Sequence, residues 1–102
     1  MRKFETLLLL SPELPADARE GLIAALAGII EREGGKVEEI DQWGMRDLAY
    51  PVRKLARGFY VRLVYGGPSS LVAELERNIR INDGVFKFLT VKLSGQKAGE
   101  EA

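Results

Sequence analysis

Residues 43–60 read WGMRDLAYPVRKLARGFY and decide the fold, because they combine strand-forming residues with a glycine and several cations. Gly44 interrupts a strand pattern, which predicts a bulge or bend inside a long strand over residues 36–53. A second strand pattern covers residues 58–65, and the short segment 54–57 between the two patterns predicts a β-hairpin. The stretch therefore indicates two antiparallel strands that meet at a protruding turn.

The flanking segments supply two helices and two more strands. Apolar residues recur at helical spacing after Pro15, and Gly34 with Gly35 is expected to end that helix. The expected elements are a strand over residues 3–10, a helix over 16–33, a helix from Pro68-Ser69-Ser70 to Asn82-Asp83-Gly84, and a strand over 85–93.

The order of these elements, β-α-β-β-α-β, predicts an α+β ferredoxin-like sandwich. In this fold a four-stranded antiparallel sheet carries two helices on one face and leaves the other face open. With 102 residues and 46% apolar content, the chain is expected to form a single domain over residues 1–93. Residues 94–102 lack an apolar anchor and are expected to form a disordered C-terminal tail.

The composition argues against most kinds of catalysis. The chain has no cysteine and no histidine, which removes disulfides, thiolate metal sites and the usual general base. Glu5, Asp41 and Asp47 do not stand out as a poised acid and base. We therefore expect no catalytic residue, metal or cofactor. The apolar run near the N-terminus is too short for a convincing signal peptide or a membrane span, so a soluble cytoplasmic protein is expected.

Charge is distributed unevenly although the formal net charge is zero. Residues 5–41 carry nine acids against three bases, whereas residues 42–92 carry nine bases against four acids. Because recognition depends on the local field, the second half is the candidate for phosphate binding. Four cations surround the expected hairpin turn, where they could reach phosphates or simply favour solubility: Arg46, Arg53, Lys54 and Arg57.

Strand alternation sorts the two faces of the sheet. Phe59, Val61, Leu63 and Tyr65 are expected to face the helices, which leaves Tyr60, Arg62 and Val64 on the open face. Tyr50 shares a parity with Leu48 and Val52, which favours core packing, although Tyr50 and Trp43 could alternatively stack on bases. Apolar residues left on the open face predict a protein partner, with self-association as the alternative.

The hairpin stretch also resembles a known family. Trp43-Gly44, Arg46, Leu48-Ala49-Tyr50-Pro51-Val52, Lys54, Gly58 and Tyr60 are similar to the signature of the bacterial small-subunit ribosomal protein S6 family. The Phe4-Glu5 pair and Arg80-Ile81 followed by Asp83 and Val85 add to the resemblance, which covers about residues 1–93.

The resemblance implies a structural constituent of the small ribosomal subunit. Such a protein would bind the central domain of the small-subunit rRNA as a heterodimer with ribosomal protein S18, and would support subunit assembly. The resemblance implies neither a membrane nor a small-molecule substrate. Among the positions that match the family, those expected to contact RNA are Arg46, Lys54 and Arg80, with Arg2 or Lys3 in addition. Two of the cations also have a structural explanation. The helix dipole favours a cation such as Arg80 near the C-terminal end of a helix, and a lysine such as Lys87 can protect an edge strand from pairing with another chain. The expected rRNA-binding set is Arg2, Lys3, Arg46, Arg53, Lys54, Arg57, Arg80 and Lys87, and the expected protein-partner face is Leu7, Leu9, Tyr60, Arg62, Val64 and Leu89.

Two other functions remain open at this point. An RRM-type reader of single-stranded RNA shares the order of elements, and residues 57–61 loosely resemble its third-strand motif, although Tyr60 replaces a small residue there. A small ferredoxin-like metabolite-binding domain is the second alternative.

Overall fold

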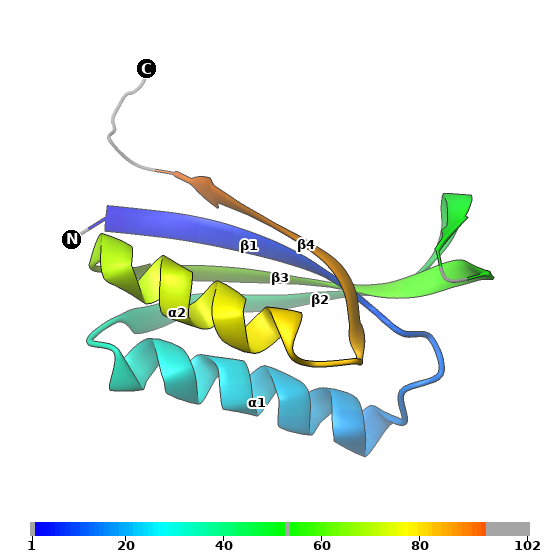
Figure 1. The fold of residues 1–102 in the computed structure, drawn as a ribbon, viewed down its shortest axis with the longest axis horizontal. Coiled ribbons are helices and arrows are strands. Elements are labelled where there is room, and N and C mark those ends of the chain that lie inside the picture. The colour runs from blue at the N-terminus through cyan, green and yellow to red at the C-terminus, as the bar shows by residue number, and fades with distance from the viewer. Residues whose placement is uncertain (1, 53, 94–102) are drawn as a thin grey trace.

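The computed structural model describes residues 2–52 and 54–93, and it contains the six expected elements in the expected order. They are β1 (Arg2–Leu10), α1 (Ala16–Arg32), β2 (Lys36–Val52), β3 (Leu55–Gly67), α2 (Ser69–Arg80) and β4 (Val85–Lys92). The strands form one antiparallel sheet in the order β2-β3-β1-β4, and both helices cover the same face (Figure 1). The ferredoxin-like prediction is confirmed, whereas the predicted disordered tail, residues 94–102, lies outside the described residues.

Each helix begins and ends where its sequence indicates. Pro15 and Pro68 occupy the N-cap positions with extended backbone, and their fixed φ suits the start of a helix. At the end of α1, Gly34 has a φ of +88°, and the amide of Gly35 donates to the carbonyl of Ile30 at 2.9 Å. Together with the bond from the Gly34 amide to the Glu31 carbonyl, this is a Schellman motif, which a glycine with positive φ makes possible.

The core lies between the helices and the inner face of the sheet. In β3, Val61, Leu63 and Tyr65 are buried and Phe59 packs against them, as strand alternation predicted. The parity of β1, which the sequence left open, is now settled, because the set that faces the helices is Phe4, Thr6, Leu8 and Leu10. The helices contribute Leu22, Ile23, Leu26, Ile30, Leu71, Leu75 and Ile79.

One polar chain crosses this apolar core. The Thr6 hydroxyl is fully buried and lies 2.8 Å from both the Tyr65 hydroxyl and the Thr90 hydroxyl. These bonds join β1, β3 and β4 side by side, and they satisfy hydroxyl groups that would be costly to bury alone.

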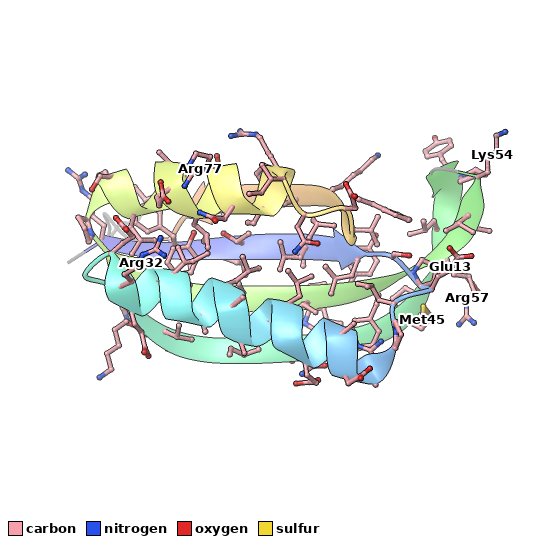
Figure 2. All side chains as sticks on the ribbon, turned by 60° about the horizontal axis from the view of Figure 1, so that its bottom comes forward. Glu13, Arg32, Met45, Lys54, Arg57 and Arg77 are labelled. Atoms are coloured by element: carbon pink, nitrogen blue, oxygen red, sulfur yellow. The ribbon has the colours of Figure 1, made fainter. Side chains whose placement is uncertain are left out.

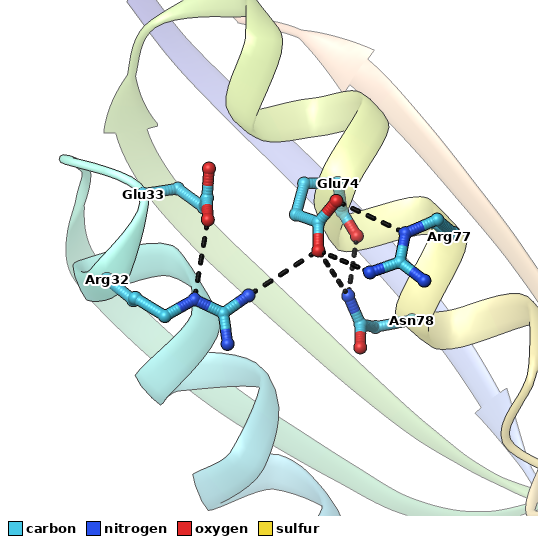
Figure 3. Close-up of polar contacts among 5 residues, drawn as sticks. All are labelled: Arg32, Glu33, Glu74, Arg77 and Asn78. Carbon is cyan, nitrogen blue, oxygen red and sulfur yellow. Dashed lines mark hydrogen bonds and ion pairs between the residues drawn. The ribbon is translucent and has the colours of Figure 1, made fainter.

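The two helices are joined at one end by an ion-pair network (Figure 3). Glu74 of α2 accepts hydrogen bonds from Arg77 at 2.6 Å and Asn78 at 3.1 Å, and Arg32 of α1 reaches the same carboxylate at 3.4 Å. The hydrogen bond from Arg77 is the main reason that the pKa of Glu74 lies below its usual value.

The β2–β3 hairpin extends beyond the rest of the sheet (Figure 1). The pairing of β1 with β3 ends at Leu10 opposite Phe59, so β3 from Leu55 to Gly58 pairs with β2 alone. We call residues 45–58 the hairpin overhang. Just before it, the register of β2 shifts at Gly44, which has a φ of +93°; the predicted bulge is confirmed, and β2 continues through it as one strand.

The prediction that Tyr50 packs in the core is wrong, because its side chain is 81% exposed. A side chain with core-facing parity is buried only where another layer of the protein covers that face of the strand. Tyr50 lies in the overhang, which β1 does not reach.

Candidate RNA-binding and protein-binding surfaces

The overhang presents three of the expected RNA-binding cations on a projecting ribbon. Lys54 occupies the turn with a φ of +67° and is exposed, as are Arg46 and Arg57. Figure 2 shows the side chains of Lys54 and Arg57 pointing away from the body of the protein. Arg53, a fourth expected cation, lies outside the described residues.

The charges of the overhang are only lightly engaged by the protein itself. The Nε atom of Arg57 lies 3.1 Å from an oxygen of Asp47, its cross-strand neighbour, and both side chains are mostly exposed. Arg46 donates from Nη2 to the backbone carbonyl of Trp43 at 3.3 Å. Exposed ion pairs contribute little to stability, so a phosphate could replace the Asp47 carboxylate at small cost.

Three of the other expected RNA-binding residues lie in two separate places. Arg2 donates to the Ser69 hydroxyl, and Lys3 lies 3.2 Å from Glu38, both at the end of β1 that is far from the overhang (Figure 1). Arg80 pairs with Glu76 at 3.5 Å, and its guanidinium lies 5.3 Å from the centre of the Phe88 ring. The expected set therefore does not form one continuous patch.

The open face of the sheet divides into an acidic part and an apolar part. In the acidic part, Arg62 pairs with Glu5 and, at 3.3 Å, with Glu39. The hydrogen bond to Glu5 is the largest cause of the raised pKa of Arg62, and the nearby Glu39 and Asp41 act in the same direction. We call the carboxylates Glu5, Glu38, Glu39 and Asp41, with the two cations Lys3 and Arg62 that pair among them, the acidic network.

The apolar part holds a hollow of about 190 Å³, which we call the apolar hollow. Leu89, 62% exposed, is its most accessible apolar side chain. The residues that line it are Leu7, Leu9, Tyr60, Lys87, Phe88 and Leu89. The structure thus brings four members of the expected partner face together with Lys87, which the sequence assigned to RNA.

Two residues of the expected partner face are buried. Leu9 is 6% exposed because its side chain covers Gly58, where an added Cβ atom would collide with it. Val64 is 7% exposed, since Glu5 and Glu39 flank it on the neighbouring strands and Arg62 bridges them. Leu9 and Val64 are therefore the least accessible members of the expected partner face, and their contact with a partner stays a prediction.

A second hollow, of about 460 Å³, lies next to the first and shares Tyr60 with it. Trp43 and Arg46 complete its lining, and the centres of the Trp43 and Tyr60 rings are 6.2 Å apart. The Trp43 indole donates to Asp41 at 2.9 Å, which links this aromatic hollow to the acidic network. Sequence reasoning left Trp43 out of the partner face. The bulge at Gly44 was the available signal, because a register shift changes which side chains share a face.

The described residues show no group of three or more acidic side chains arranged to hold a metal ion. Within the same residues, no helix is long and apolar enough to cross a membrane.

Known proteins resemble this chain over most of its length. The family model of ribosomal protein S6 matches residues 3–92. Small ribosomal subunit protein bS6 of Desulfovibrio desulfuricans is 74% identical over 102 residues and the full length of both chains, and that of Nitratidesulfovibrio vulgaris is 69% identical over 92% of this chain and 93% of its own. The crystal structure of 30S ribosomal protein S6 from Thermotoga maritima superposes with a TM-score of 0.86 at 27% identity, covering 90% of this chain and 87% of that one. The chain belongs to the ribosomal protein S6 family.

Proposed function

We propose that this protein binds the central domain of the small-subunit rRNA as a heterodimer with ribosomal protein S18, and so supports assembly of the subunit. Its family makes it a structural, non-enzymatic protein of the cytoplasmic small ribosomal subunit. The observation that carries the finer proposal is the contrast between the cationic overhang and the open face beside it, which is apolar in one part and acidic in the other.

The overhang supports the RNA-binding half of the proposal. It is a two-stranded ribbon with exposed cations, the shape and charge that can follow a phosphate backbone. Only a few cations are available there, and the formal net charge of the chain is zero, so the affinity for RNA alone should be modest.

The open face supports the partner half. The acidic network holds four carboxylates against two cations, an excess of two negative charges. It lies next to two hollows whose apolar and aromatic linings also include Arg46 and Lys87. Such a surface suits a basic protein that places an apolar side chain in the hollow. The basic partner would then add to the positive field that meets the RNA.

The test compares three mixtures at physiological salt: this protein with the rRNA fragment, S18 with the fragment, and both proteins with the fragment. We expect the two proteins together to bind at least tenfold more tightly than either alone. If this protein alone binds the fragment as tightly as the pair does, the proposal that it binds rRNA as a heterodimer with S18 is wrong.

A further inference from the structure

Arg19 lies in the first turn of α1 and contacts the base of the hairpin overhang. The Cζ atom of its guanidinium is 3.9 Å from the centre of the Phe59 ring, which places the cation directly over the aromatic face. Its Nε atom is enclosed and has no hydrogen-bond partner among the described residues. Arg19 is therefore held in place by stacking rather than by a hydrogen bond from Nε.

Phe59 marks the point at which the hairpin loses its support from the sheet. It is the last residue of β3 that pairs with β1, and towards the turn β3 pairs with β2 alone. Phe59 faces the helices and packs against the core. A contact on its ring therefore acts at the place where the overhang loses its pairing with β1.

The chemistry of arginine suits this position. A guanidinium is flat and weakly hydrated, so it can lie on a ring while partly removed from water, where the attraction between cation and ring is stronger. Lysine keeps the charge but lacks the flat group, and methionine keeps the apolar length but lacks the charge. Beside this contact, Gln42 of β2 donates to Glu20 of α1 at 3.0 Å, which gives the helix a second hold on the hairpin strands.

We propose that Arg19 is a positioning residue: from the helix layer it fixes the direction of the hairpin overhang, and thereby the reach of Arg46 and Lys54. The part of this inference that concerns RNA rests on the proposed function. The part that concerns the direction of the overhang does not.

The first experiment measures amide hydrogen exchange in the isolated protein. Arg19→Met should increase exchange about tenfold for the ladder amides of residues 45–47 and 55–58, with little change in β1, because local opening depends on the contact that is lost. Arg32→Met is the matched control, since Arg32 is on the same helix but contacts Glu33 and Glu74 at its other end (Figure 3). Equal exchange of the overhang in the two variants would overturn the proposal.

A double-mutant cycle assigns the effect to the ring. Phe59→Leu should also speed exchange in the overhang, and adding Arg19→Met to it should have little further effect, because both changes remove the same contact. Arg19→Lys should recover part of the protection. Fully additive effects of the two changes would show that Arg19 acts elsewhere and would contradict the proposal.

The second experiment measures binding to the rRNA fragment with S18 present. Arg19→Met should weaken binding severalfold without changing the slope of log K against log salt, because a positioning residue does not itself neutralise a phosphate. A slope reduced by about one would identify Arg19 as a phosphate contact and overturn the positioning role. If the wild-type proteins do not bind the fragment, the proposed function fails, and the exchange experiment still decides the role of Arg19.

Discussion

Gly44 has a φ of +93°, a backbone conformation that residues with a Cβ atom rarely adopt. An added Cβ would meet nothing within 4 Å, so Gly44→Ala tests backbone strain without a steric clash. We expect Gly44→Ala to lower the free energy of unfolding by about 1 kcal/mol. Gly28, in the middle of α1, also has free space around it, and Gly28→Ala should raise stability by up to about 1 kcal/mol. Urea denaturation measures both, and a shift of the same sign in the two variants would contradict the argument.

Tyr65 provides a test that depends on pH. Its hydroxyl bonds to Thr6 inside the core, and burial is the main cause that raises its pKa above the usual tyrosine value. Tyr65→Phe should lower stability by about 1 kcal/mol at neutral pH, because the Thr6 hydroxyl loses one of its two partners.

The same group should make the wild type lose stability in alkali. Since the folded pKa is raised, the folded state holds this proton more tightly, so the contribution is complete below the unfolded pKa of about 10 and is lost as the pH rises through the folded pKa. Tyr65→Phe should remove that part of the decline in denaturation curves measured from pH 8 to about 11. An identical alkaline decline in both proteins would exclude Tyr65 as its source.

The hairpin overhang is the predicted site of phosphate contact. Arg46→Ala combined with Lys54→Ala should weaken binding to the rRNA fragment and reduce the salt slope by about two, one for each cation removed. The melting temperature should stay within about 3 °C, because both side chains are exposed. Arg32→Ala with Arg77→Ala removes the same charge from the helix layer and should leave the salt slope unchanged. Equal loss of affinity in both double variants would mean that net charge, and not the overhang, binds RNA.

The elements themselves were predictable because local signals define them. Pro15 and Pro68 lie at the N-caps, and Gly34 accepts the positive φ that ends α1. Alternation placed Val61 and Leu63 correctly, since helices lie behind that part of β3. The same rule failed for Tyr50, because no sequence pattern shows where a neighbouring strand ends.

The binding surfaces were less predictable for the same kind of reason. Leu9 and Val64 have the parity of the open face, yet Leu9 packs on Gly58 and charged side chains of the adjacent strands flank Val64. The rings of Trp43 and Tyr60 lie together next to the register shift at Gly44, which changes the side of the sheet on which the following side chains of β2 lie. Accessibility on a sheet thus depends on cross-strand neighbours that one-dimensional alternation does not identify.

The formal net charge of zero results from a division of the protein surface into a cationic part and an acidic part. The overhang presents cations at one end of the sheet, while the open face presents the acidic network and two hollows. We infer that the neutral total reflects two partners of opposite charge, an acidic RNA and a basic protein.

This division can be tested by a substitution that should affect the two partners differently. Leu89→Lys places a charge in the apolar hollow, where a docked partner would have to remove it from water. We expect affinity for S18 to fall at least tenfold, while binding of this protein alone to the rRNA fragment is unchanged or slightly stronger, since a positive charge is added. Ile81→Lys is the matched control, because Ile81 is 70% exposed at the end of α2 and lies outside both hollows. Calorimetric titration with S18 measures the effect, and wild-type affinity in the Leu89 variant would remove the apolar hollow from the interface.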